Sequence, residues 1–161
     1  MDYLLYAFYV LPCLIGGLHL AIRDIIERKI SRLAVLCYLI IQLIWFGVFI
    51  AFRVLEPSVL LTALIFMTTA YICQFILYCL SRGALGYGDV TAICVCALLF
   101  APASMNNVDW LIIWWLLMSI LGLLHIAYVL KIRKGRTIAF VPAEYISAVL
   151  TVAALIFTQS L

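Results

Sequence analysis

Charged residues are scarce in this chain of 161 residues. Lys and Arg together number 10, Asp and Glu number 7, and charged residues make up 11% of the sequence against 69% hydrophobic. A soluble domain of this size needs more polar surface than that, so the composition and the mean hydropathy of +1.28 place the chain in a lipid bilayer. The formal charge of only +3 gives no reason to expect a nucleic-acid partner.

The sequence also lacks any CxxC pair. All six cysteines fall inside apolar runs, where a thiol behaves as a small hydrophobe. Cys94 and Cys96 are two positions apart, so on a helix they point in different directions. We therefore expect neither a zinc site nor a disulfide framework, and no cofactor.

Long hydrophobic runs fill most of the chain. A transmembrane helix needs about 20 mainly apolar residues, and the polar breaks divide the sequence into about six such runs. The predicted spans are residues 3–22, 33–52, 58–80, 90–104, 110–130 and 138–159. The sequence thus predicts an all-α integral membrane protein, with residues 1–161 forming one polytopic domain.

The basic residues predict the orientation of these spans. All of them except Arg53 follow the first, third or fifth span, and Lys and Arg concentrate in cytoplasmic loops. Both termini are therefore expected on the extracytoplasmic side. The residues concerned are Arg23, Arg28, Lys29, Arg32, Arg82, Lys131, Arg133, Lys134 and Arg136.

The segment RGALGYGDV, residues 82–90, separates the third and fourth spans. Counted from Val90 to the break at Pro102, the span that follows it covers only about 13 residues, or roughly 20 Å, which is short of a hydrocarbon core of ~30 Å. Irregular backbone at membrane depth must be buried in protein or line a wet cavity, and Gly83, Gly86 and Gly88 permit tight turns. The loop is expected to lower Asp89 into a wet cleft, although aspartate is also a favoured N-cap.

Asp24 lies on the same predicted side of the membrane as Asp89. An intramembrane ionisable residue is by default a functional candidate, and these two stand at the cytoplasmic ends of predicted helices. Glu144, in the first turns of the last span, is expected to be neutral or paired with Arg136 or Arg133. Two other groups have simpler explanations: His19 and His125 suit hydrogen bonds between helices, and Trp110, Trp114 and Trp115 suit an interfacial aromatic belt.

The segment GYGD, Gly86 to Asp89, resembles the Gly-x-Gly-Asp motif of intramembrane aspartyl proteases, and its neighbours resemble the type IV prepilin (leader) peptidases. In that family a first aspartate precedes Ile-Pro-Asn by five residues, and here Asp24 precedes Ile30 at that spacing. IAFVPA, residues 138–143, is similar to a late Ile-Pro-Phe-Gly-Pro element. The likeness extends over about residues 10–150.

The resemblance implies an aspartic endopeptidase of the bacterial inner (cytoplasmic) membrane, with Asp24 and Asp89 as catalytic residues and Gly86 and Gly88 in the supporting loop. Its substrates would be pilins or pseudopilins of type IV pili and protein secretion systems, which carry a short basic leader that ends in glycine. Glu27 and Glu144 are candidates for docking that leader. Larger members also carry a cytoplasmic region with two CxxC pairs that is associated with N-methylation, so this chain resembles the short, peptidase-only form.

The chain departs from the family pattern at three positions. Ser31 and Arg32 stand where the family usually has Pro-Asn, and Thr91 stands where many members have lysine. Two other functions fit the same sequence. Six spans in two sets of three suit a small proton-coupled or ion-coupled transporter with inverted repeats, and an inactive paralogue would serve in pilus or secretion assembly.

Overall fold

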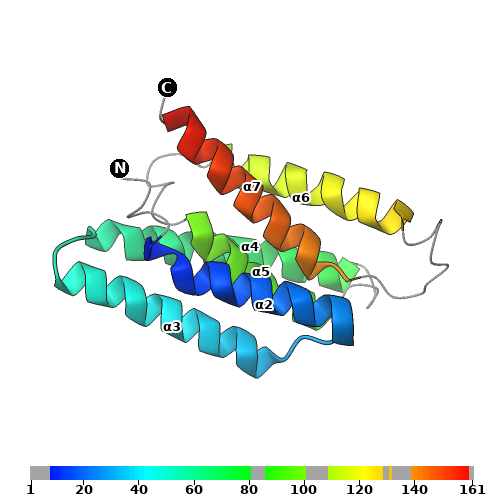
Figure 1. Cartoon of the computed structure of the whole chain (residues 1–161), viewed down its shortest axis with the longest axis horizontal. Coiled ribbons are helices and arrows are strands. Elements are labelled where there is room, and N and C mark those ends of the chain that lie inside the picture. The colour runs from blue at the N-terminus through cyan, green and yellow to red at the C-terminus, as the bar shows by residue number, and fades with distance from the viewer. Residues whose placement is uncertain (1–7, 81–85, 101–108, 129–130, 132–138, 160–161) are drawn as a thin grey trace.

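The computed structural model describes residues 8–80, 86–100, 109–128, 131 and 139–159. Six α-helices and one short 3₁₀ helix account for nearly all of these residues. The helices other than α7 run roughly along the length of the bundle, and α7 crosses them obliquely (Figure 1). In chain order the elements are α2 (Leu11–Glu27), α3 (Arg32–Ala51), α4 (Pro57–Leu80), α5 (Tyr87–Ala97), η1 (Leu98–Phe100), α6 (Asp109–Tyr128) and α7 (Val141–Gln159).

Two of the helices, α3 and α4, are long and apolar enough to cross a membrane. They begin and end within one residue of the predicted spans 33–52 and 58–80. A core helix of a soluble protein buries most of its side chains, yet only 17% of the apolar window of α3 and 28% of that of α4 are buried. Large apolar residues such as Ile44 and Leu61 are exposed instead, and such extensive apolar exposure is suited to lipid.

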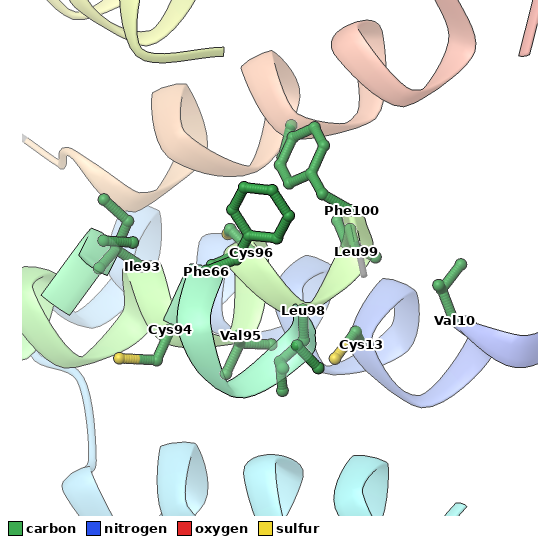
Figure 2. Close-up of a cluster of buried hydrophobic side chains, with 14 of the residues drawn as sticks. Val10, Cys13, Phe66, Ile93, Cys94, Val95, Cys96, Leu98, Leu99 and Phe100 are labelled. Carbon is green, nitrogen blue, oxygen red and sulfur yellow. The ribbon is translucent and has the colours of Figure 1, made fainter. Parts of the chain in front are cut away.

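The short helix α5 lies in the middle of the bundle. It contacts α2, α3, α4 and α7, and every residue from Ala92 to Phe100 is buried. Figure 2 shows its side chains meeting Phe66 of α4 and Cys13 of α2 in the main apolar cluster. At 11 residues, followed by one 3₁₀ turn, α5 is the shortest α-helix among the described residues. The burial of Ala92 to Phe100 explains why this part of the segment carries no charged side chain.

Pro12 lies in the first turn of α2. It lacks an N–H and so cannot donate a hydrogen bond to the carbonyl of Phe8. Side chains of α3 take over the unpaired groups. The Trp45 indole N–H donates to the Phe8 carbonyl at 3.0 Å. The amide of Gln42 accepts from the Cys13 N–H at 3.1 Å and donates to the Tyr9 carbonyl at 2.8 Å. Hydrogen bonds from the next helix thus stabilise the backbone around Pro12.

The other end of α2 extends further than predicted, since the helix continues to Glu27 instead of ending at residue 22. Arg23 and Glu27 form an i,i+4 ion pair at 2.7 Å that supports the added turn. The helix then ends because Arg28 adopts the left-handed conformation, with φ 54°. Asp24 therefore lies within the last turn of α2, and not after the helix.

Glycines allow α2 to pack closely against two neighbours. A Cβ added to Gly16 would lie 2.6 Å from the ring of Tyr38 in α3, and one added to Gly17 would lie 2.5 Å from the ring of Tyr145 in α7. His19 also bonds to the Tyr38 hydroxyl, with 3.1 Å between Nδ1 and the hydroxyl oxygen. This is the interhelical role that its place in the sequence predicts. Small residues at such crossings are typical of helices that pack in membranes.

Candidate functional site

The C-terminal end of α2 and the N-terminal ends of α5 and α7 lie together at one end of the bundle (Figure 1, right). Asp24 comes from the first of these ends and is buried. Its Oδ2 accepts a hydrogen bond from the backbone N–H of Val141, at 3.1 Å, across 117 positions of sequence. Residues 139–143 are the described part of the IAFVPA element. The N–H of Val141 has no partner within α7, and it holds the carboxyl of Asp24 instead.

Asp89 occupies the third position of α5, and Gly86 is the N-cap. Its Oδ2 accepts from the backbone N–H of Gly86 at 3.1 Å. Asp89 therefore caps the helix from inside its first turn, so the alternative of an N-cap aspartate is wrong in position although correct in kind. The carboxyl is only partly exposed, and its second oxygen is available to another group.

The two aspartates lie close enough to interact electrostatically. Asp24 follows the predicted span 3–22 and Asp89 precedes the predicted span 90–104, so both lie at the end of the bundle. Burial, and then the negative charge of Asp24, raise the pKa of Asp89 to about 7, against the opposing effect of the Gly86 N–H. Burial also raises the pKa of Asp24, which the Val141 N–H and the charge of Arg28 oppose. Such a pair can share one proton near neutral pH.

Gly88 brings the two aspartate segments into contact. A Cβ at this position would lie 3.0 Å from the Cβ of Ile30, the residue six positions after Asp24. This distance is tighter than ordinary van der Waals contact, so the first turn of α5 and the α2–α3 loop can approach this closely only because residue 88 has no side chain. Gly83 lies outside the described residues, and Gly86 is exposed.

Tyr87 anchors the start of α5 to two other helices. Its hydroxyl lies 2.9 Å from the hydroxyl of Tyr71 in α4, and its ring packs edge-on against Tyr78. The guanidinium carbon of Arg32 lies 4.6 Å from the centre of the same ring, a cation–π contact with the start of α3. Arg32 is one of the departures from the family pattern, and here it helps to hold the segment that carries Asp89.

The other two departures act on the backbone. The Ser31 hydroxyl accepts from the Ala34 N–H at 3.4 Å and so caps α3. The Thr91 hydroxyl donates to the Gly88 carbonyl at 2.9 Å, within the first turn of α5. Each of these residues therefore supports a segment next to one of the aspartates.

The two predicted leader-docking residues have different surroundings. Glu27 is exposed, and both of its carboxylate oxygens are bonded to Arg23. Glu144 is fully buried inside the bundle, and the docking role expected for it stays a prediction. The alternative pairing of Glu144 with Arg133 or Arg136 involves partners outside the described residues.

Sequence reasoning missed the partners of Glu144. Its Oε1 accepts from the Gln74 amide at 3.3 Å, and its backbone carbonyl and Ser147 accept from the indole of Trp114. Trp114 is fully buried, so it belongs to the core and not to an interfacial belt. One signal was present in the sequence: Gln42 and Gln74 are isolated amides within apolar runs, and buried amides of this kind bond to a neighbouring helix.

Chemically, this end of the bundle offers two interacting carboxyls, held by backbone N–H groups of two helix starts and backed by a third, buried carboxyl. Across the described part of the chain, no group of three His, Cys, Asp or Glu side chains is arranged to hold a metal ion. Comparisons with protein-family models, with curated proteins and with solved structures found no match.

Proposed function

We propose that this protein is an intramembrane aspartyl endopeptidase that removes the short leader of prepilin-like substrates at the cytoplasmic face of a bacterial inner membrane. The observation that carries the proposal is the placement of Asp24 and Asp89 at one end of an apolar bundle, where the close contact of Gly88 with Ile30 brings their two segments together. In this proposal the apolar stretches of the described helices are membrane spans, Asp24 and Asp89 lie beyond them at the cytoplasmic ends, and both chain termini lie on the extracytoplasmic side.

The two carboxyls divide the chemistry between them. The ionised aspartate removes a proton from a water molecule, whose oxygen attacks the scissile carbonyl carbon, while the protonated aspartate donates its proton to the carbonyl oxygen. When the tetrahedral intermediate collapses, the C–N bond breaks and the leaving amine takes up a proton from the pair. Because two nearby carboxyls do not readily both ionise, the pair holds the single proton that this reaction needs.

The surroundings of the pair also suit the proposed substrate. A prepilin-like protein presents an apolar helix preceded by a basic leader, and the exposed apolar faces of α3 and α4 offer lipid-level surfaces beside which such a helix can lie. The cleavage point would then stand level with Asp24 and Asp89. Glu27, which is exposed, remains our candidate for contact with the basic leader.

The test is cleavage of a prepilin-like protein by the purified enzyme in liposomes. Asp24→Asn and Asp89→Asn should each lower the cleavage rate by at least about a thousandfold, and the double variant should be hardly worse, as for groups that act as one unit. Asparagine at position 89 still accepts from the Gly86 N–H through its amide oxygen. Capping is therefore kept while proton transfer is lost.

Asp109→Asn provides the matched control, because Asp109 begins α6 at the opposite end of the bundle (Figure 1). It makes the same chemical change far from the pair and should cleave like the wild type. Substantial cleavage by Asp89→Asn would refute the pair. Absence of cleavage by the wild type, with proton-driven or ion-driven flux that both aspartates control, would support the transporter instead.

A further inference from the structure

Glu144 of α7 and Gln74 of α4 form a buried polar pair that the cleavage chemistry does not use. Glu144 is 0% exposed and Gln74 is 1% exposed. The Gln74 Nε2 donates to Glu144 Oε1 at 3.3 Å. The remaining oxygen of each side chain, Oε1 of Gln74 and Oε2 of Glu144, has no hydrogen-bond partner among the residues that the structure describes.

These two unpaired oxygens are complementary only if one of them carries a proton. An amide oxygen can only accept, and an ionised carboxylate has two acceptors and no donor. A protonated carboxyl has one O–H, which Glu144 can direct to the amide oxygen of Gln74. Buried polar atoms are nearly always hydrogen-bonded, and this single proton satisfies both of the atoms that are otherwise left without a partner.

The groups that face the Glu144 carboxyl do not favour its ionised form. Among the described residues, Asp24 from α2 and Asp89 from α5 act on it with negative charge, and it also interacts with the thiols of Cys94 and Cys96 in α5. From α6, the Trp114 indole bonds to the backbone carbonyl of Glu144 and to Ser147, and not to the carboxyl. An isolated buried carboxylate is far costlier than a buried neutral acid.

We propose that Glu144 is a neutral carboxylic acid that closes a ring of two hydrogen bonds with the Gln74 amide, and that this ring positions the two aspartates. Glu144 lies one turn after Val141, whose N–H holds Asp24. Gln74 lies one turn after Tyr71, which bonds to Tyr87 beside Asp89. The ring therefore joins the supports of both aspartates. The positioning role rests on the proposed function, whereas the protonation of Glu144 does not.

Infrared spectroscopy tests the protonation directly. The chain has three glutamates, so carbon-13 labelling of glutamate isolates three carboxyl signals. In wild-type protein at neutral pH we expect one labelled C=O band of a protonated acid, which should vanish in Glu144→Gln and persist in Glu27→Gln. Absence of that band in the wild type, or its persistence in Glu144→Gln, would overturn the proposal.

A residue exchange tests the ring. The double variant Gln74→Glu/Glu144→Gln transposes acid and amide and should keep the protonated-acid band, the wild-type unfolding temperature and cleavage within about threefold of wild type. The matched control, Gln42→Glu/Glu144→Gln, moves the acid to the other fully buried glutamine and should unfold at a lower temperature. If the exchange is no better than this relocation, the ring is refuted.

The two proposals fail in different ways. If the wild type shows the band and the exchange preserves the unfolding temperature but no prepilin-like substrate is cleaved, then the ring stands and the peptidase does not. If cleavage depends on both aspartates but the band is missing, then the peptidase stands and the ring does not. The band in wild-type protein decides the protonation even if a variant fails to fold.

Discussion

Two fully buried glutamines, Gln42 of α3 and Gln74 of α4, have very different hydrogen-bond partners. The Gln42 amide accepts from Cys13 and donates to Tyr9, so both of its ends are bonded to backbone groups of α2. The Gln74 amide makes one longer bond, to Glu144, and no described residue bonds to its oxygen unless Glu144 carries the proposed proton. Gln42 completes the backbone of a broken helix, whereas Gln74 lies beside three interacting carboxyls. Incomplete pairing thus distinguishes the end of the bundle where the three carboxyls lie.

The largest expected effect is the pH dependence of cleavage, which should depend on the carboxyls near Gln74 and not on the region around Gln42. The pair needs one proton to donate, and the pKa of Asp89 is raised to about 7. Above that pH both aspartates are ionised and no proton is left to donate. The cleavage rate should therefore fall about tenfold for each pH unit, or about a hundredfold at two pH units above the pKa. Initial rates in liposomes buffered on both sides provide the measurement. A flat profile across this range would contradict a shared proton.

Gln42→Ala should have the next largest effect, and it should act on stability alone. It leaves the Cys13 N–H and the Tyr9 carbonyl without partners, which should lower the free energy of unfolding by about 2 kcal/mol. Unfolding in detergent can be followed by circular dichroism. The cleavage rate per folded molecule should stay unchanged, so a large loss of rate in folded Gln42→Ala would remove the division between the two regions.

Gly88→Ala should reduce cleavage by about tenfold, because the added Cβ pushes the Asp89 segment away from Ile30 and reacting groups tolerate little displacement. Ile30→Gly in the same chain should restore most of the rate, because it removes the Cβ that the added methyl group would meet. Gly47→Ala is the matched control, since a Cβ there meets nothing within 4 Å. If the double variant is as slow as Gly88→Ala, the contact with Ile30 is not the cause.

The smallest effect is expected for Tyr38→Phe, which removes the bond to His19 at the α2–α3 crossing. This bond is exposed, so its loss should lower the free energy of unfolding by about 0.5 kcal/mol and leave cleavage unaffected. Thermal unfolding in the same detergent measures it. A loss as large as that of Gln42→Ala would show that the crossing depends on the hydroxyl and not on the close packing at Gly16.

The sequence predicted well those features that depend on composition and local pattern. The bounds of α3 and α4 follow from uninterrupted apolar runs, and the shortness of α5 follows from the distance between its loop and Pro102. The proximity of Asp24 and Asp89 followed from placing the loops on one side of the membrane. The end of α2 was missed because Arg23 and Asp24 look like the start of a loop, although an ion pair to Glu27 extends the helix.

Features that depend on distant contacts could not be read from the sequence. Glu144 and Gln74 are 70 positions apart, and no local pattern distinguishes a carboxyl that faces a buried amide from one that faces a loop arginine. Trp114 failed for the same reason: a tryptophan near a helix end suits the membrane interface until a specific acceptor, here Ser147, is known to lie opposite it.

The repair of the Pro12 break has a consequence for how the chain enters the membrane. Until α3 is present, the carbonyls of Phe8 and Tyr9 and the N–H of Cys13 lack their partners, and unpaired backbone groups are very unfavourable in hydrocarbon. Helix α2 is therefore expected to be unstable in lipid as long as α3 is absent. We expect α2 and α3 to enter the membrane together as a hairpin, in which Gln42 and Trp45 of α3 supply the hydrogen bonds that the backbone at the start of α2 needs.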